Sequence, residues 1–378
     1  MNDNMKAVDT YKSGPFYFSL RFDEGKISQE LFKAHSLFHI VSNIPILPEI
    51  AAQLDEDLIR KSIFSTAAIE GNPLSEAEVG KVLSDEEKQE KLKKFDRQIM
   101  NLKRTYAYVR VLGESTEPYV VTEEVIKNIH KTLTEGSDMD KNDPGRYRAH
   151  EVKVGDVPHG GVYVPPKILE DIKKLMSEFV RFLNSEEVLK IDPALRAALA
   201  HYYFALIHPF GDGNGRTARV LEAILLKTAY IKYVPVMMSN YYYKNIDEYF
   251  VVFSSAERNK DHDITAFLEF FTKGLNATLT EIYGFITANI RMFTLRHYFE
   301  SLRKNGTITQ RQYDLLTLLI DGMHKFTLKE LFEKDNLKII YRNVTERTAR
   351  RDIKRLLDRK LISPLADGLY EINTKILG

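Results

Sequence analysis

The sequence predicts a mainly α-helical protein that contains one small β-hairpin and ends in a winged helix-turn-helix domain. Apolar residues recur at helical spacing over most of the chain, as Leu54, Leu58 and Ile63 illustrate. The segment 152–165 instead alternates apolar and polar residues around a glycine-rich turn, which is typical of a β-hairpin. After residues 304–307 the pattern changes to short helices followed by a second hairpin.

The chain is long enough for two or three domains. It has 378 residues, and a domain typically takes roughly 100 to 200. We expect an N-terminal helical region over 1–110, a central core over 111–303 and the winged-helix domain over 307–378.

Composition excludes several kinds of chemistry. The 54 Lys and Arg residues balance 53 Asp and Glu residues, so net charge predicts no polyanionic partner for the whole chain. Cysteine is absent, which excludes disulfides, thiolate metal sites and cysteine nucleophiles. We find neither a signal peptide nor an apolar stretch of the roughly 18 residues that span a bilayer. We therefore expect a cytoplasmic protein with no membrane partner.

The run 208–219 reads His-Pro-Phe-Gly-Asp-Gly-Asn-Gly-Arg-Thr-Ala-Arg and carries the strongest functional pattern. An alanine-rich helix is expected to end at His208, and another to begin near Arg216. A glycine loop that leads into a helix N-terminus presents N–H groups to an anion. Arg216 and Arg219, three residues apart, would add two guanidinium groups on one helical face. The pattern predicts a phosphate site.

Two further residues in this run suggest a reaction. Asp212 is its one carboxylate, and Mg²⁺ bound to phosphates needs few protein ligands. His208 can accept a proton from an attacking hydroxyl. Each residue alone also has a structural explanation, such as a helix end or a turn, but their conjunction within twelve residues favours a catalytic site.

The same run resembles the signature of the Fic family: His, any residue, Phe, any residue, Asp or Glu, Gly-Asn-Gly-Arg, two of any residue, and Arg. Every position matches, and similarity of arrangement extends over about residues 16–275. The resemblance implies a Fic-type helical bundle that transfers AMP from ATP to a Ser, Thr or Tyr hydroxyl of a target protein.

The resemblance also assigns roles within the signature. His208 would be the general base, Asp212 the Mg²⁺ ligand, and Phe210 a core residue. Asn214, Gly215 and neighbouring amides would form an anion hole, and the two arginines would contact the β- and γ-phosphates. Nucleotide contacts are expected from Asp212, Gly213, Asn214, Gly215, Arg216, Thr217, Ala218 and Arg219.

The hairpin and an aromatic pair would complete the nucleotide site. An edge strand can pair with an extended peptide, so the hairpin could act as a flap that delivers the target hydroxyl. Gly161 and Val162 are its expected nucleotide contacts, and a purely structural hairpin is the alternative. Tyr249 and Phe250 resemble a pair that lines the adenine pocket in relatives, where Tyr is common at the second position. Core packing explains this pair almost equally well.

A regulatory element is expected before the signature. Residues 65–72 resemble the inhibitory motif of Fic proteins, which is Ser or Thr, three of any residue, and Glu followed by Gly or Asn. Ser65 and Glu70 fill its key positions. By resemblance Glu70 would pair with Arg219, displace the γ-phosphate and keep the enzyme autoinhibited in cis. The alternative is an ordinary helix-end glutamate.

The C-terminal domain suggests a second partner. Its expected third helix, 345–357, resembles a winged-helix recognition helix, and the stretch 341–360 holds eight basic and three acidic residues. Such a patch suits a phosphate backbone, although winged helices also dock proteins, so both readings stay open. Two rivals of the main hypothesis remain: a DNA-binding regulator that uses the core as a nucleotide sensor, and transfer of another nucleotidyl or phosphoryl group. Self-modification and a homodimer also stay open.

Overall fold

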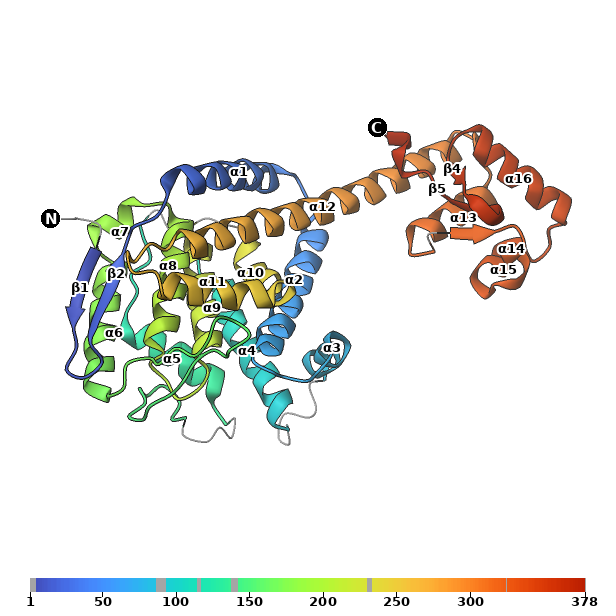
Figure 1. Ribbon diagram of the computed structural model, residues 1–378. Helices are drawn as coiled ribbons and strands as arrows, with labels where there is room; N and C mark the ends of the chain where they lie inside the picture. The colour runs from blue at the N-terminus through green and yellow to red at the C-terminus, as the bar shows by residue number, and fades with distance from the viewer. Residues whose placement is uncertain are drawn as a thin grey trace. The chain divides into compact units, whose positions relative to one another are not determined.

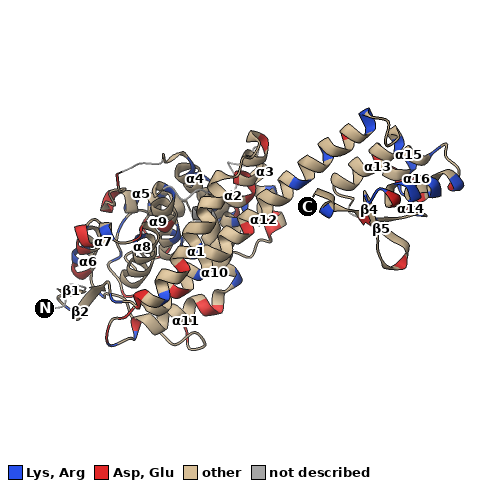
Figure 2. Cartoon of the chain, turned by 90° about the horizontal axis from the view of Figure 1, so that it is seen from above, with Lys and Arg blue, Asp and Glu red and all other residues tan. Residues whose placement is uncertain are grey.

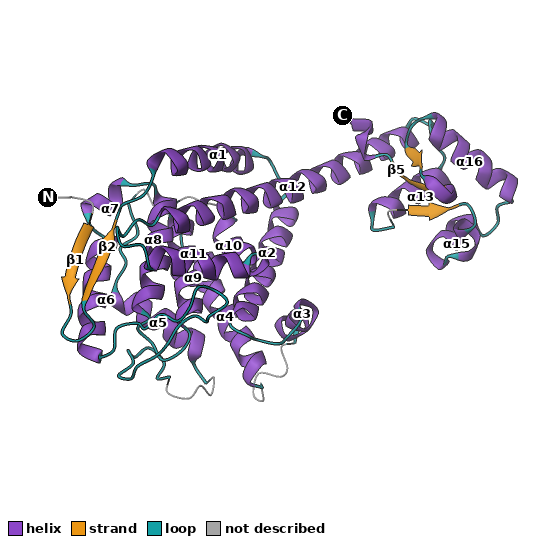
Figure 3. Ribbon diagram, in the orientation of Figure 1, coloured by secondary structure: helices purple, strands orange, loops and turns teal. Residues whose placement is uncertain are grey.

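The computed structural model describes residues 5–85, 93–113, 117–136, 142–229, 233–323 and 325–377, with 234–236 described by their backbone alone. Helices make up most of it, with two small sheets (Figure 3). The chain divides into two compact units, Met1–Tyr283 and Gly284–Gly378.

The first unit opens with a β-hairpin that the sequence analysis did not predict. Strands β1 (Met5–Asp9) and β2 (Pro15–Ser19) pair antiparallel, so that Val8 lies opposite Phe16. Phe18 is fully buried, with its ring 5.1 Å from that of Tyr203. The hairpin is therefore anchored to the helical core.

Helices α8 (Pro193–Ile207) and α9 (Asn214–Thr228) form the centre of this unit, and the other helices surround them (Figure 1). Almost every side chain of α8 is buried, because its alanines allow close approach on all sides. The surrounding helices are α1 (Glu24–Asn43), α2 (Pro48–Ile69), α3 (Glu76–Ser84), α4 (Lys94–Val111), α5 (Glu123–Thr134), α6 (Leu169–Leu183), α7 (Glu186–Lys190), α10 (Val234–Lys244) and α11 (Ile246–Glu257).

Local sequence signals set several of these helix ends. The Thr122 side chain accepts a hydrogen bond from the Val125 N–H and caps α5. Ser75 and Glu78 form a reciprocal capping box at α3. At the end of α2, the N–H of Asn72 reaches back to the Ala67 carbonyl around Gly71, whose φ of 78° favours glycine.

The hairpin expected over 152–165 is reduced to a single pair of residues. Val154 and Tyr163 form an isolated antiparallel bridge, with N···O distances of 3.0 and 2.8 Å. Gly155, Gly160 and Gly161 all have positive φ, and these turns interrupt the extended backbone that a longer ladder needs. The segment, called the flap below (residues 152–165), is a loop closed by one bridge.

The second unit consists of several helices and one three-stranded antiparallel sheet, with strand order β3–β5–β4. Strand β3 (Lys325–Thr327) is followed directly by the short helix α14 (Glu330–Glu333). The side chains of Thr309 and Thr345 each cap the helix that follows them. The elements are α13 (Gln310–Ile320), β3 (Lys325–Thr327), α14 (Glu330–Glu333), α15 (Asp335–Tyr341), α16 (Glu346–Asp358), β4 (Ile362–Pro364) and β5 (Leu369–Ile372). The winged-helix assignment stays a prediction.

Helix α12 (Thr265–Lys304) continues past the limit of the first unit. Leu295 and Phe299, near its end, are fully buried in the same cluster as Leu316 and Leu356 of the second unit. The end of α12 thus packs with residues that follow the expected 304–307 boundary. No helix within the described ranges is both long and apolar enough to cross a membrane.

Candidate active site

His208 lies where α8 ends and takes the left-handed conformation, with φ of 48°. Its Nδ1 is 3.2 Å from the Ala205 carbonyl oxygen. A carbonyl oxygen only accepts, so this bond requires the proton on Nδ1 and leaves the Nε2 lone pair available. Burial lowers the pKa of His208 to about 4, which keeps the ring neutral near pH 7. The residue is thus prepared to accept a proton.

The loop after His208 is held by Phe210 and Asn214. Phe210 is buried, as predicted, and stacks on His130 with ring centroids 3.6 Å apart. The Asn214 side chain donates to the Phe210 carbonyl and accepts from the Phe210 N–H, both at 2.9 Å. These contacts give the turn one conformation.

His130 of α5 supports the loop from behind. Its Nδ1 accepts from the Gly145 N–H at 2.9 Å, so the proton is on Nε2, which donates to the Asp212 carbonyl at 2.8 Å. Burial lowers the pKa of His130 to about 4, consistent with this neutral tautomer. His130 therefore links the signature loop to the segment that leads into the flap.

Arg148 forms the second link between these segments. Its Nε donates to the His208 carbonyl at 2.8 Å, and its two terminal nitrogens donate to the His150 and Pro166 carbonyls at 2.7 Å. The side chain is buried, and burial lowers its pKa to about 10, so it remains a cation. One guanidinium group thus ties the segments at both ends of the flap to the backbone of His208.

The anion cradle predicted from the glycines lies at the start of α9. Gly213 precedes the helix with φ of 76°, and a Cβ there would lie 2.7 Å from a Thr134 methyl group. The first-turn N–H groups have no acceptor within the helix, because helical bonds begin only at Thr217. Arg216 is buried, with its Nη2 3.1 Å from Asp212 Oδ1. Asp212 itself is 41% exposed.

Glu70, just beyond α2, reaches this cradle. Its Oε1 accepts from Arg219 Nη2 at 2.8 Å, and the same nitrogen lies 3.2 Å from the Thr66 carbonyl. A Cβ at position 215 would be 2.3 Å from Glu70 Oε1, so only glycine leaves room for the carboxylate. Burial raises the pKa of Glu70, but the nearby Arg219 and Arg216 charges outweigh it, and the pKa is lowered overall. The carboxylate is ionised and lies beside Gly215 in the first turn of α9.

A cavity of about 230 Å³ joins these residues to the aromatic pair. Tyr249 is buried, and its hydroxyl lies 2.8 Å from Nε2 of the buried His201. It is therefore a core residue, and it also lines the cavity. Of the residues expected at the nucleotide, those that line the cavity are Glu70, Gly161, Gly215, Arg219, Tyr249 and Phe250, together with His208.

Other expected contacts lie outside this lining. Val162 is half exposed, and its side chain is not part of the wall. Thr217 and Ala218 are fully buried, and the Thr217 hydroxyl donates to the Gly213 carbonyl at 2.8 Å. Ser65 is also buried, with its hydroxyl 3.3 Å from Asn240 Oδ1. Their expected roles remain predictions.

The roles of His130 and Arg148 were not predicted from the sequence. Each acts on a segment more than ten positions away, so no local spacing reveals it. Arg148 ends the run Gly145-Arg146-Tyr147-Arg148, which lies shortly before the expected hairpin. Phe253 and Glu257, which also line the cavity, follow Tyr249 at helical spacing.

Comparisons with known proteins agree with this geometry. Residues 120–226 match the model of the Fic/DOC family. The protein adenylyltransferase Fic of Culex quinquefasciatus is 27% identical over 252 residues, which cover 66% of this chain and 46% of the relative. The Drosophila ananassae protein of the same name is 33% identical over 186 residues, covering 48% and 35%. The chain thus spans less than half the length of these curated relatives.

Solved structures show the same fold. A Fic family protein from Desulfovibrio desulfuricans aligns with a TM-score of 0.56 at 18% identity, covering 92% of this chain and 95% of that one. Fic-1 from C. elegans aligns with a TM-score of 0.55 at 22% identity, covering 70% and 74%. At such identities the likeness concerns the fold. Together with the matched family model and the complete signature, it shows that residues 120–226 of this chain form a domain of the Fic/DOC family.

Proposed function

We propose that this chain transfers AMP from ATP to a Ser, Thr or Tyr hydroxyl of a target protein. The observation that carries the proposal is that the His208 ring, Gly215 at the cradle and Arg219 line one cavity. The relatives named protein adenylyltransferase support it. Base, anion site and aromatic wall are the three parts that such a transfer requires.

The reaction follows from the protonation state of His208. The acceptor hydroxyl gives its proton to Nε2 while its oxygen forms a bond to the α-phosphorus. The bond between that phosphorus and the oxygen that bridges to the β-phosphate breaks, and pyrophosphate leaves. The N–H groups at the start of α9 and the arginines would stabilise the added negative charge. The lowered pKa of His208 favours the neutral base at the start of the step.

Asp212 fits a Mg²⁺ ligand. Its carboxylate is partly exposed beside the cradle and lies 3.1 Å from Arg216. Within the described residues no three acidic or histidine side chains gather as a metal cluster, so a single carboxylate plus phosphate oxygens is the donor set on offer. When bound, Mg²⁺ would neutralise phosphate charge and orient the leaving pyrophosphate.

Glu70 would hold the enzyme in an inhibited state. Its carboxylate already occupies Arg219 and lies beside Gly215, where phosphate oxygens would otherwise bind. ATP could then enter only with its γ-phosphate displaced, and the α-phosphorus would be badly aligned for attack. Removal of this carboxylate should therefore activate the protein.

The decisive experiment is label transfer from ATP with Mg²⁺. We expect Glu70→Gly to increase transfer of α-phosphate label several-fold or more, to an added acceptor or to the protein itself. His208→Ala should abolish transfer in either background. Glu135→Gly, which alters an exposed glutamate at the end of α5, is the matched control and should leave the rate unchanged.

Each contrary result identifies a different alternative. Transfer of γ-label instead of α-label would indicate phosphorylation. Label from another nucleoside triphosphate but not from ATP would indicate a different nucleotidyl transfer. Absence of covalent label in every variant, with ATP still bound, would favour a nucleotide sensor. An unchanged rate in Glu70→Gly on every acceptor would contradict the inhibitory role.

DNA binding by the second unit is a second candidate, favoured by the surface of α16. Figure 2 shows Lys and Arg side by side along this helix. The acidic Asp352 of the same helix does not reduce the positive charge of this surface. Its side chain is buried, and its Oδ2 lies 2.6 Å from Arg311 Nη2. The exposed basic residues of the helix are Arg347, Arg350, Arg351, Lys354 and Arg355.

This second candidate predicts salt-dependent binding of the full chain to duplex DNA. Arg351→Ala with Lys354→Ala should weaken it and reduce the slope of log K against log[salt] by about 2. Lys329→Ala, an exposed lysine of the same unit, should have little effect. Absence of binding at low salt would instead leave a protein-docking role for the unit.

A further inference from the structure

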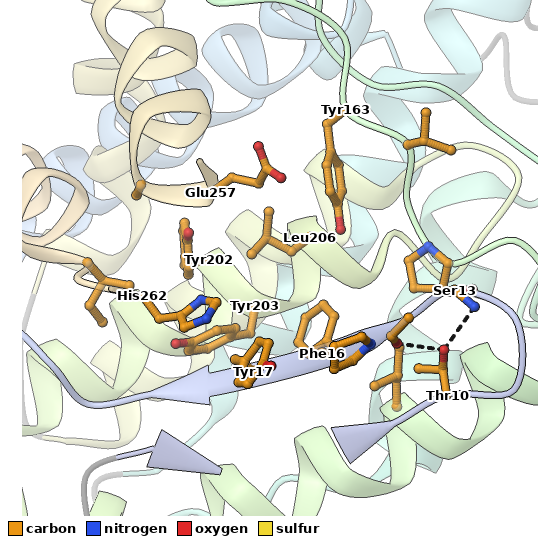
Figure 4. A pocket seen from close by; sticks show the side chains of 17 residues that line it. Thr10, Ser13, Phe16, Tyr17, Tyr163, Tyr202, Tyr203, Leu206, Glu257 and His262 are labelled. Carbon is orange, nitrogen blue, oxygen red and sulfur yellow. Dashed lines mark hydrogen bonds between the residues drawn. The ribbon is translucent and has the colours of Figure 1, made fainter. Parts of the chain in front are cut away.

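A second cavity, of about 250 Å³, lies beside the nucleotide cavity in the first unit. Strand β2, the end of the flap, α8 and the end of α11 surround it (Figure 4). Tyr163, Leu206 and Glu257 line both cavities, so these three side chains form the wall between them. No role described above uses this second space.

Three oxygen-bearing side chains line this second cavity: Tyr163 and Glu257 of the shared wall, and Tyr202 of α8. Figure 4 shows the Glu257 carboxylate extending toward the Tyr163 ring, with Leu206 beneath them. After burial, the charge of Glu257 raises the pKa of Tyr163, and the charges of Tyr203 and Glu257 raise the pKa of Tyr202. The cluster thus offers one carboxylate and two hydroxyl oxygens to an occupant.

The charge of Glu257 is only weakly compensated within the protein. Its one described ion pair is with its neighbour Arg258, at 3.9 Å, and Arg258 is 54% exposed. Burial raises the pKa of Glu257, because a carboxylate loses favourable hydration there. A cation that entered the cavity would relieve this cost, whereas an anion would add to it.

The remaining walls also suit a cation. Tyr17 stacks on His262 with ring centroids 4.0 Å apart, and both line the cavity with Tyr202 and Phe16. Aromatic faces attract ammonium and guanidinium groups through their negative π surface. Neither lysine nor arginine occurs among the described residues that line the space. The lining thus combines one carboxylate with several aromatic rings, and both kinds of group attract an organic cation.

We propose that this cavity binds an organic cation through a primary ammonium or guanidinium group. The Glu257 carboxylate and the hydroxyls of Tyr163 and Tyr202 would accept its N–H bonds, and the aromatic rings would contact its carbon chain. The cation can come from a free small amine or from a Lys or Arg side chain of a protein. Because Tyr163, Leu206 and Glu257 line both cavities, an occupant of the second cavity would contact residues that also line the nucleotide cavity.

Direct binding to the full chain, without ATP or acceptor, tests the site independently of the proposed transfer. Titration calorimetry with pentylamine and with pentan-1-ol, its uncharged counterpart, separates charge recognition from burial of the alkyl chain. We expect the amine to bind about tenfold or more tightly than the alcohol. Equal binding of both probes, or no binding of the amine at millimolar concentration, would overturn the proposal.

Two variants locate the binding. Glu257→Gln keeps the side-chain size and should weaken pentylamine about tenfold or more, while Tyr163→Phe should weaken it less. Glu248→Gln, on the exposed face of the same helix, is the matched control. Unfolding midpoints should confirm that the variants fold. Unchanged amine affinity in folded Glu257→Gln would contradict the assignment.

A further pair of probes identifies the source of the cation. N-acetyl-lysine methylamide presents the lysine side chain within a peptide backbone, and putrescine represents free amines. Binding of the lysine derivative supports a protein side chain, and binding of putrescine alone supports a small amine. Binding of neither, like failure of pentylamine, would count against the cavity as a cation site.

Discussion

At the residue scale, two imidazoles differ in their hydrogen bonds although burial lowers the pKa of each to about 4. His130 uses both nitrogens for backbone hydrogen bonds and so is fixed as a structural link. His208 uses Nδ1 for the Ala205 carbonyl, which leaves the lone pair of its Nε2 available to accept a proton. The difference lies in hydrogen-bond partners and not in pKa.

We expect the His208 ring of the nucleotide-free protein to remain neutral until the pH falls to about 4. The physical cause is burial, to which the positive charge of Arg148 adds. NMR titration of the imidazole carbon-bound protons, assigned by their loss in His208→Ala, measures this. An inflection near the ordinary value of about 6.5 would contradict the burial of the ring.

The sequence alone indicates those site residues that share a short segment. His208, Asp212 and Arg219 lie within twelve positions, and their spacing around the glycines predicts base, carboxylate and cation together. Glu70 came from resemblance to a motif, because 149 positions separate it from Arg219 and no local pattern joins them. No sequence pattern indicates that His130 stacks on Phe210, because this contact depends on how α5 packs against the loop.

At the element scale, Arg148 joins three segments through their carbonyl oxygens. Arg148→Met would leave these acceptors without their donor in a buried place. We expect the free energy of unfolding to fall by about 3 kcal/mol or more, since each lost charge-assisted bond costs about 1 to 3 kcal/mol. Urea denaturation measures the change.

Arg146 provides the matched comparison. It lies two positions away and is 79% exposed, with one surface ion pair to Asp143 at 3.3 Å. Arg146→Met should change the free energy of unfolding by no more than about 0.5 kcal/mol. Equal urea midpoints for both variants would mean that the three carbonyl bonds of Arg148 contribute little.

Elements differ in how far their sequence determines them. Helix α5 was predictable because Thr122 caps it and its apolar residues keep one period. The flap alternates like a strand, but three glycines with positive φ leave a single bridge at Val154 and Tyr163. Alternation of apolar and polar residues indicates which side chains are buried, but it does not show that the segment pairs with another strand. The β1–β2 hairpin was missed although Phe16 and Phe18 alternate in the same way.

At the scale of the whole molecule, the boundary between the two units determines which fragment of the chain can fold on its own. Helical periodicity runs unbroken through residues 284–304, so the sequence suggested a boundary only where Gly306 interrupts it. The buried cluster of the second unit instead includes Leu295 and Phe299. A boundary is set by which side chains share a core, and this sharing is not visible in local periodicity.

A fragment of residues 284–378 should therefore unfold cooperatively in urea, whereas 307–378 should be far less stable. Burial of Leu295 and Phe299 together contributes about 5 kcal/mol or more, comparable with the total stability of a small domain, about 5 to 15 kcal/mol. Within the longer fragment, Phe299→Ala should lower the urea midpoint strongly, and Arg291→Ala, an exposed position of the same helix, should not. If 307–378 matched the longer fragment, the end of α12 would be only a linker, because its two buried side chains would then contribute nothing to the core that they enter.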